Sequence, residues 1–398
     1  MQNYGFERPD FVSKEVYEDF RKSYQVVLER RCARWKTVID QGNLVRDYQL
    51  KRFCRKGIPA QFRSHVWMTL SGAYETMQQN PKVYQTAAAA QPPKTTLTTI
   101  MADIPRTFPE NVHFSQAQGK GDKLQALQRI LTAFAIAFPK IGYCQGLNYV
   151  AATLLLAMQG VPEAEAEERA FWLLHALSHH IVPKYYSDSM VDVRVDCLVF
   201  EELLKKKAPS IYKTLKNAHV DCVVLATKWF ICLFADVLPI ETVLRIFDSL
   251  FYEGNKILFR ACIALAKLHT REILYDSLFP DDKQTLYCHE FLKAMFTLPG
   301  SLSRSLIRKL RGKCLQTVKV TLSELEAQER NYRERMALQN QQQQKEAQQK
   351  DEEQPTNDSY SEEVDDSDNV NEMLKPSRHT DHVESSPSLN APASHGSL

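Results

Sequence analysis

KLQALQRILTAFAIAF, residues 123–138, decides the fold class of this 398-residue chain. Its large apolar side chains recur at spacings of three and four residues, the period of an α-helix with one buried face. This stripe comprises Leu124, Leu127, Leu131, Phe134 and Phe138. The same pattern returns in AFWLLHALSHHIV (170–182), CLVFEELLKKKAP (197–209), ETVLRIFDSLFYEG (241–254) and ILFRACIALAKLH (257–269). Because period-two alternation is scarce, the sequence predicts an all-α fold.

The helical pattern defines one predicted domain, residues 51–315, with further segments on either side of it. Residues 1–50 form a predicted N-terminal extension, in which residues 11–40 have the pattern of an amphipathic helix. Residues 316–350 are charged and rich in Gln, and are predicted as a helix or linker. Residues 351–398 are acidic and rich in Ser, and are predicted to be disordered because they have too few apolar side chains for a core.

The net charge of +2 hides an asymmetry along the chain. Residues 351–398 carry 12 acidic against two basic side chains, a net of −10, which leaves +12 on residues 1–350. A basic body suits an acidic protein partner, an anionic membrane surface or nucleic acid. Nucleic acid is the weakest of the three, because the sequence has no recognition-helix motif, zinc site or aromatic platform. The predicted N-terminal helix also has basic positions, for which a solvated face is favoured and lipid contact is the alternative. These positions are Arg30, Arg31, Arg34 and Lys36.

Cysteine usage and hydropathy indicate a cytoplasmic protein. The nine cysteines include no C-x-x-C pair, and Cys222 and Cys232 lie in apolar helical sequence typical of buried thiols. A reducing compartment is therefore expected. The start, MQNYGFERPDF, has no apolar signal core. The most apolar stretch, VDCVVLATKWFICLFADVLP (220–239), is interrupted by three charged residues, so it is predicted as one buried helix and no transmembrane segment is expected.

Two loops carry the candidate chemistry. No G-x-x-x-x-G-K-[ST], H-E-x-x-H or G-x-S-x-G motif is present, so neither a nucleotide site nor a metal site is predicted. In IMADIPRTFPENV (100–112), the prolines predict a stiff, irregular loop that presents Arg106, Thr107 and Phe108. Ile104 precedes Pro105 and is expected to be extended. The structural alternative for Arg106 is an ion pair with a neighbour such as Asp103.

The second loop, GYCQGLN (142–148), presents Gln145. Gly142 and Gly146 allow a tight turn and the close approach of a partner surface. This chain thus presents an arginine and a glutamine on separate loops but has no predicted nucleotide site of its own. These are the two side chains that a GTPase lacks when it hydrolyses GTP slowly. A guanidinium can donate two hydrogen bonds to the phosphate oxygens, and a carboxamide can hold the attacking water in line.

Three short motifs, complete and in order, resemble the signatures of TBC-domain Rab GTPase-activating proteins. They are R-x-x-x-W (Arg63, Trp67), I-x-x-D-x-x-R (Ile100, Asp103, Arg106) and Y-x-Q (Tyr143, Gln145). The later ATKWFICLFADVLPIETVLRIFDSLFYEG (226–254) resembles the C-terminal half of the family, with Phe247 where a tryptophan is common. The resemblance covers about residues 51–300 and implies a two-lobed helical domain.

The resemblance also implies roles for the motif residues. Arg106 is expected to be an arginine finger, and Gln145 a glutamine finger that replaces the GTPase's own glutamine. Asp103 is expected to orient the Arg106 loop by pairing or capping, and Tyr143 to fix the Gln145 loop through ring packing. The remaining loop-supporting or partner-binding positions are Arg63, Trp67 and Ile100. For the first two of these, stem packing and a cation–π contact are expected to brace the floor beneath the loops.

The implied partner is a Rab small GTPase in its GTP-bound form. GTP and Mg²⁺ are expected on that partner, so no cofactor is predicted for this chain. Regulation of vesicle trafficking is expected, with a cytoplasmic protein recruited to endomembranes through its partner. The alternative function is a non-catalytic Rab-binding scaffold or effector. The presence of both Arg106 and Gln145 favours catalysis over that alternative.

Overall fold

The computed structural model describes residues 4–7, 13–42, 44–115, 121–187, 189–270, 273 and 288–352. Within these ranges the structure is helical, and the β pairing is an isolated bridge between Phe6 and Asn111. The all-α prediction is therefore confirmed. Apart from Asp351 and Glu352, which end the last helix, the predicted disordered tail lies outside the described residues. No helix in the described ranges has the length and apolar character needed to span a membrane.

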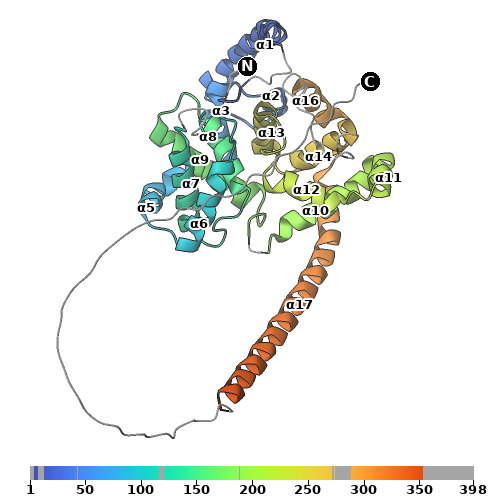
Figure 1. Cartoon of the computed structure of the whole chain (residues 1–398). Helices are drawn as coiled ribbons and strands as arrows, with labels where there is room; N and C mark the ends of the chain where they lie inside the picture. Colours follow the sequence, from blue (N-terminus) through green and yellow to red (C-terminus); the bar gives the residue numbers. More distant parts are fainter. Residues whose placement is uncertain are drawn as a thin grey trace, which may run out of the picture. The chain divides into compact units, whose positions relative to one another are not determined.

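Figure 1 shows the order of the helices along the chain. The first group comprises α1 (Lys14–Asp40), α2 (Tyr48–Lys56), α3 (Ala60–Ser71), α4 (Ala73–Gln79), α5 (Val83–Ala89), α6 (Lys94–Asp103), the 3₁₀ turn η1 (Ile104–Arg106), α7 (Leu124–Ala137), α8 (Leu147–Ala157), α9 (Glu163–Ala176) and the π turn η2 (Leu177–Ile181). The second comprises α10 (Val191–Lys207), α11 (Pro209–Asn217), α12 (Cys222–Ile231), α13 (Ile240–Glu253), α14 (Lys256–Leu268), α16 (Cys288–Thr297) and α17 (Arg304–Glu352).

Two sets of helices pack around one shared helix. In the first set, α7 contacts α5, α8 and α9, and α4 also packs on α9. In the second set, α10, α12 and α14 contact one another. Helix α13 contacts α2, α3 and α8 on one side and α14 and α16 on the other, so it joins the two sets into one compact unit that extends to Arg330. Figure 1 shows the two sets side by side.

Helix α7 is buried on more than the one face that its apolar positions predict. Leu127, Leu131 and Phe134 of the predicted stripe are buried, and so are Ile130 and Ala133 between them. A helix that is buried on most sides is typical of the centre of a large domain. The reason is that α5, α8 and α9 all pack against α7.

The predicted single helix over 220–239 is wrong. Helix α12 ends at Ile231, and the chain then turns through Leu233 and Phe234, which have positive φ angles of 48° and 68°. These two side chains are fully buried, and the Phe234 N–H donates to the Trp229 carbonyl at 2.9 Å. Apolar packing holds a left-handed turn that the apolar sequence alone did not indicate.

Helix α17 crosses the predicted boundary at residue 315/316. Its first turns belong to the compact unit, because Arg311 donates to both carboxylate oxygens of Asp196 at 2.6 Å. Its buried positions, spaced by three and four residues, are Ile307, Leu310, Cys314 and Val318. Residues 316–350 are thus helical, and from Asn331 onward the chain forms a second unit that is helical up to Glu352.

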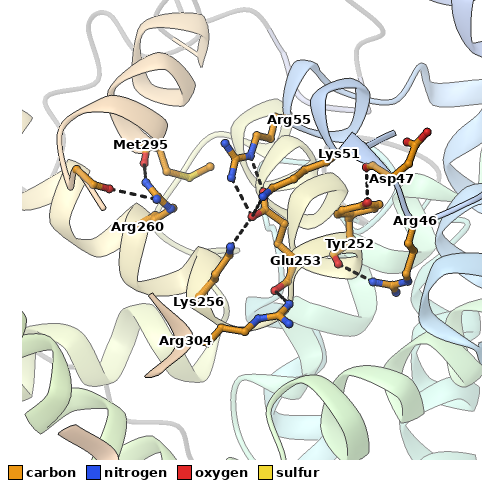
Figure 2. Close-up of polar contacts among 11 residues, drawn as sticks. Arg46, Asp47, Lys51, Arg55, Tyr252, Glu253, Lys256, Arg260, Met295 and Arg304 are labelled. Atoms are coloured by element: carbon orange, nitrogen blue, oxygen red, sulfur yellow. Dashed lines mark hydrogen bonds and ion pairs between the residues drawn. The ribbon is translucent and has the colours of Figure 1, made fainter. Parts of the chain in front are cut away.

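A buried carboxylate at the end of α13 gathers cations from α2 and α14. Figure 2 shows Lys51, Arg55 and Lys256 converging on Glu253, whose side chain is 2% exposed. Arg55 Nη2 lies 2.9 Å and Lys256 Nζ 2.7 Å from Glu253 Oε2. Burial alone raises the pKa of Glu253, but the hydrogen bonds from Arg55 and Lys256 outweigh it and lower the pKa to about 2.

Glu253→Gln tests this hub. We expect a loss of about 3 kcal/mol in the free energy of unfolding at neutral pH, because three partly buried cations lose the buried carboxylate that they share. Since the folded-state pKa is depressed, the contribution of Glu253 is present above its ordinary pKa of 4.5 and is lost as the pH falls toward about 2. In urea unfolding, the gap between wild type and variant should therefore narrow over that window. A gap that is the same at every pH would contradict the charge assignment.

Candidate functional site

Arg106 is positioned by a 3₁₀ turn that continues directly from α6. Helix α6 ends at Asp103, and Ile104, Pro105 and Arg106 form η1. The prediction of an extended Ile104 is wrong, since its φ and ψ are −56° and −50°. Pro105 is tolerated because it stands at the first turn of η1, where the missing N–H costs little. Residues 104–106 are therefore a short helical turn, and the irregular conformation predicted for this segment begins only at Thr107.

Of the three side chains predicted to be presented by this segment, the structure exposes one. Arg106 has 51% of its side chain exposed, whereas Thr107 and Phe108 are buried. Phe108 has a positive φ of 50°, and its ring lies 5.3 Å from the rings of both Phe6 and Tyr149. Aromatic packing thus holds the backbone just after Arg106 in a strained conformation. Thr107 and Phe108 anchor the turn, and Arg106 projects from it.

Gln145 lies on an exposed turn that abuts the end of α12. Within the described ranges its side chain has no hydrogen-bond partner, so the carboxamide is free for a ligand. Gly146 has a φ of 104°, and a Cβ at this position would meet Ile231 Cγ2 at 2.4 Å. Ile231 is fixed in turn, because its carbonyl accepts from the Tyr186 hydroxyl at 2.9 Å. Glycine is therefore required here both by conformation and by close packing.

The carboxylate of Asp103 connects the two turns. Its Oδ1 accepts from Arg106 Nη2, and its Oδ2 accepts from the Tyr143 hydroxyl at 2.5 Å. Asp103 is 2% exposed, so its charge depends on these two donors. Burial and the hydrogen bond to Asp103 raise the pKa of Tyr143 far above its usual range, which keeps this hydroxyl a donor. Tyr143 therefore acts through a hydrogen bond to the other turn, in addition to the ring packing predicted for it.

Two further hydrogen-bonded links run parallel to the first. Asn148 Nδ2 donates to Thr107 Oγ1 at 2.8 Å, while Asn148 Oδ1 accepts from the Gly146 N–H at 2.9 Å. The Tyr149 hydroxyl donates to the Arg106 carbonyl at 2.8 Å. Asn148 is fully buried, so breaking its bonds leaves polar groups unsatisfied. The Arg106 turn and the Gln145 turn are thus joined at three points and form one rigid element.

Arg63 and Trp67 lie deeper than the two turns and share a carboxylate. Arg63 Nε and Trp67 Nε1 donate to Asp248 Oδ1 at 3.1 and 2.9 Å, and all three residues are buried. No cation–π contact between Arg63 and Trp67 occurs in the described part of the chain. The Arg63 guanidinium instead lies 6.0 Å from the ring of Tyr4 and donates to the Tyr4 hydroxyl. The predicted cation–π brace is wrong, because Asp248 on α13 draws both donors toward itself.

This network reaches the Arg106 turn through the N-terminal residues. The Asn111 side chain donates to the Tyr4 carbonyl at 2.9 Å, and Phe6 packs edge-on against Phe108. Arg63 therefore supports the turn indirectly, through residues 4–7 and not by contact. Sequence reasoning missed Asp248, although an acidic residue at a core position of an apolar helix is a signal for a buried partner.

Ile100 and Phe247 are core residues. Ile100 is fully buried in α6, one helical turn before Asp103, so it fixes the helix that carries the turn. Phe247 is also fully buried, and its ring lies 6.0 Å from that of Trp67. Within the described ranges, no group of His, Cys, Asp or Glu side chains is arranged to hold a metal ion.

Gly146→Ala and Gly142→Ala form a matched pair of variants. Both glycines have positive φ, but a Cβ on Gly142 would approach nothing closer than the Pro139 carbonyl at 3.9 Å. We expect Gly142→Ala to cost about 1 kcal/mol in the free energy of unfolding, from backbone strain alone. Gly146→Ala should cost about 1–3 kcal/mol more, because it also overpacks against Ile231. Equal losses in urea unfolding would contradict the close packing of the Gln145 turn on α12.

Comparison with known proteins places these features in a family. The sequence model of the Rab-GTPase-TBC domain matches residues 60–274. The human growth hormone-regulated TBC protein 1 is 39% identical over 321 residues, which cover 78% of this chain and 94% of that protein. The growth hormone-regulated TBC protein 1-A of Danio rerio is 38% identical over 322 residues, covering 78% and 88%.

Solved structures agree with the sequence comparisons. The Chlamydomonas flagellar RabGAP TBC domain superposes with a TM-score of 0.57 at 30% identity, covering 80% of this chain and 98% of that one. The Ypt/Rab-GAP domain of Gyp1p shares the fold, with a TM-score of 0.52 at 20% identity, covering 74% and 99%. The resemblance seen in the three motifs is therefore confirmed. The chain belongs to the TBC-domain family of Rab GTPase-activating proteins.

Proposed function

We propose that this chain accelerates GTP hydrolysis on a GTP-bound Rab by supplying Arg106 and Gln145 in trans. The observation that carries the proposal is that hydrogen bonds join the Arg106 turn to the Gln145 turn. The exposed guanidinium and the exposed carboxamide project from two segments that three hydrogen-bonded links join. Two groups held on one rigid element can act on one reacting centre with little loss of entropy on docking.

Arg106 would stabilise the charge that develops on the transferred phosphoryl group. Its Nη2 contacts Asp103, and its other guanidinium nitrogens have no partner in the described part of the chain. A guanidinium has five N–H donors, so Arg106 can bind phosphate oxygens while Asp103 still limits its orientation. An arginine supplied in trans contributes about 10³–10⁵-fold to the rate of GTP hydrolysis.

Gln145 would orient the attacking water. A carboxamide both accepts and donates hydrogen bonds, which matches a water that must be held in line with the bond that breaks. Its backbone is fixed on one side by Gly146 against Ile231 and on the other by Tyr143 bonded to Asp103. Within the described part of the chain the side chain has no hydrogen-bond partner, so docking need not break a hydrogen bond between Gln145 and another residue of that part.

Asp103 and Tyr143 are positioning residues in this scheme, and they do not touch the reacting atoms. GTP and Mg²⁺ would belong to the partner, and this chain would act without a cofactor of its own. A cytoplasmic protein that meets its partner at endomembranes, and thereby regulates vesicle trafficking, fits this role. The match to the Rab-GTPase-TBC domain and the similarity to the Chlamydomonas RabGAP TBC domain support the choice of a Rab as partner.

Single-turnover GTP hydrolysis on a panel of purified Rabs tests the proposal. Wild type should accelerate one or a few Rabs, and Arg106→Ala and Gln145→Ala should each remove about 10²-fold or more of that acceleration. Arg194→Ala on α10 and Gln79→Ala on α4 are matched controls, because both side chains are exposed and lie outside the two turns. The controls should retain the wild-type rate.

Binding of the same Rabs in a non-hydrolysable GTP state separates the alternatives. If Arg106→Ala binds the Rab as wild type does but no longer stimulates hydrolysis, the catalytic assignment holds. A wild-type chain that binds a Rab without accelerating hydrolysis would instead indicate a scaffold or effector. If the Ala variants accelerate hydrolysis as well as wild type, the assignment of the two fingers is wrong.

A further inference from the structure

A second polar feature lies outside the matched domain, between α1 and α2. A surface hollow of about 220 Å³ opens there. Its apolar lining is Val27, Trp35 and Phe53, and its charged lining is Arg30, Arg31, Arg34 and Lys56. Trp35 is 1% exposed and its indole N–H donates to the Gly57 carbonyl at 3.1 Å, so the floor of the hollow is rigid. Among the residues that the structure describes, no carboxylate lines this hollow.

The cations of the hollow lack acidic partners. Arg30, Arg34 and Lys56 are exposed and form no ion pair with any residue in the described ranges. The guanidinium of Arg31 lies 5.8 Å from the ring of Tyr24. The neighbouring face of α2 differs, since there Lys51 and Arg55 form ion pairs with Glu253 (Figure 2). Two basic clusters thus flank one helix, and one of them is uncompensated.

The protein interior adds further positive charge near this hollow. Arg245 on α13 is 3% exposed, and among the described residues its Nε and Nη1 have no hydrogen-bond partner. A Cβ on Gly57, the residue after Lys56, would lie 2.2 Å from Arg245 Nε, which places this guanidinium next to the end of α2. Burial, followed by the charge of Arg245, lowers the pKa of Arg31. Slight burial, followed by the charges of Arg52, Arg34 and Arg31, lowers the pKa of Lys56. Like charges so arranged destabilise one another unless an anion binds.

Helix α1 also exposes apolar side chains beside these cations. Val27 lines the hollow and is 43% exposed, and Val16 and Val26 on the same helix are 53% and 47% exposed. Val27, Arg30, Arg31 and Arg34 are spaced by three and four residues, so they share one face of α1. A helix face that combines cations with exposed apolar residues suits the interface of an anionic membrane.

We propose that the hollow between α1 and α2 binds the phosphorylated head group of an anionic lipid. Arginine forks match phosphate oxygens bidentately, and the hollow has the size of one small group, not of an extended chain. The apolar residues of α1 would contact the membrane around the bound head group. Lys36, which the sequence groups with the other three cations, does not line the hollow and is not part of the site.

Co-sedimentation with vesicles tests this inference on the full chain. The probes are phosphatidylcholine vesicles alone, with phosphatidylinositol bisphosphate, and with phosphatidylserine at matched total charge. Wild type should bind the bisphosphate vesicles well above the serine vesicles. Arg30→Glu combined with Arg34→Glu should weaken that binding about tenfold or more, because each cation near the surface contributes about 1 kcal/mol. Lys213→Glu combined with Lys216→Glu on α11 is the control with the same change of charge, and should weaken binding less than about twofold.

Two further arms identify the source of the head group and keep the test interpretable. Val27→Ser should weaken vesicle binding but leave binding of the soluble inositol bisphosphate head group unchanged in calorimetry. If the soluble head group binds as tightly as the vesicles do, the membrane assignment is wrong. Equal binding to serine and bisphosphate vesicles, or equal loss in both charge-reversal variants, would overturn the site. Arg106→Ala should bind vesicles as wild type does. The vesicle experiment therefore tests the lipid site even if the proposed activation of a Rab is wrong.

Discussion

One buried carboxylate, that of Asp103, constrains the surface on which the proposed activity depends. A charge with 2% exposure is stable only when it is paired, and its donors are Arg106 on one turn and Tyr143 on the other. The sequence left open that Arg106 has a structural role, as the partner of Asp103 in an ion pair. That ion pair is present in this structure. It is compatible with a catalytic role, because the side chain keeps about half of its surface exposed and retains unused donors.

The Asp103 link is supported from below by a second buried carboxylate. Asp248 accepts from Arg63, Trp67 and the Ile58 N–H, so α13 is tied to α3 and to the segment that precedes it. The Tyr4 hydroxyl extends this network to the N-terminal residues, which pack on Phe108. The motif arginine and tryptophan therefore hold the scaffold of the site, at a distance from the two turns. Both side chains are buried, so we expect their substitution to affect the site through packing.

Much of the fold could be predicted because helical periodicity is a local property. The helices at 170–176, 241–253 and 257–268 coincide with apolar patterns, and the exposure of Arg106 and Gln145 agrees with their loop context. The predictions that failed concerned features that depend on contacts between residues far apart in the sequence. Thr107 and Phe108 are buried by Asn148 and Phe6, and the pairing of Arg63 with Asp248 spans 185 residues. The end of α12 at Ile231 is set by tertiary packing, which an apolar run does not reveal.

A double-mutant cycle on Asp103→Asn and Tyr143→Phe tests most directly whether the two turns act as one element. The measured quantity is the rate constant of GTP hydrolysis by a responsive Rab in single-turnover conditions. We expect strong coupling, of about 1 kcal/mol or more in the activation free energy, because both substitutions act on the same hydrogen bonds. Tyr143→Phe removes the donor to Asp103, and Asp103→Asn leaves one acceptor oxygen for the two donors, Arg106 and Tyr143, that the carboxylate binds. The double variant should then be little slower than the slower single variant. Fully additive effects would contradict the account, since they would mean that the Arg106 and Gln145 turns contribute independently.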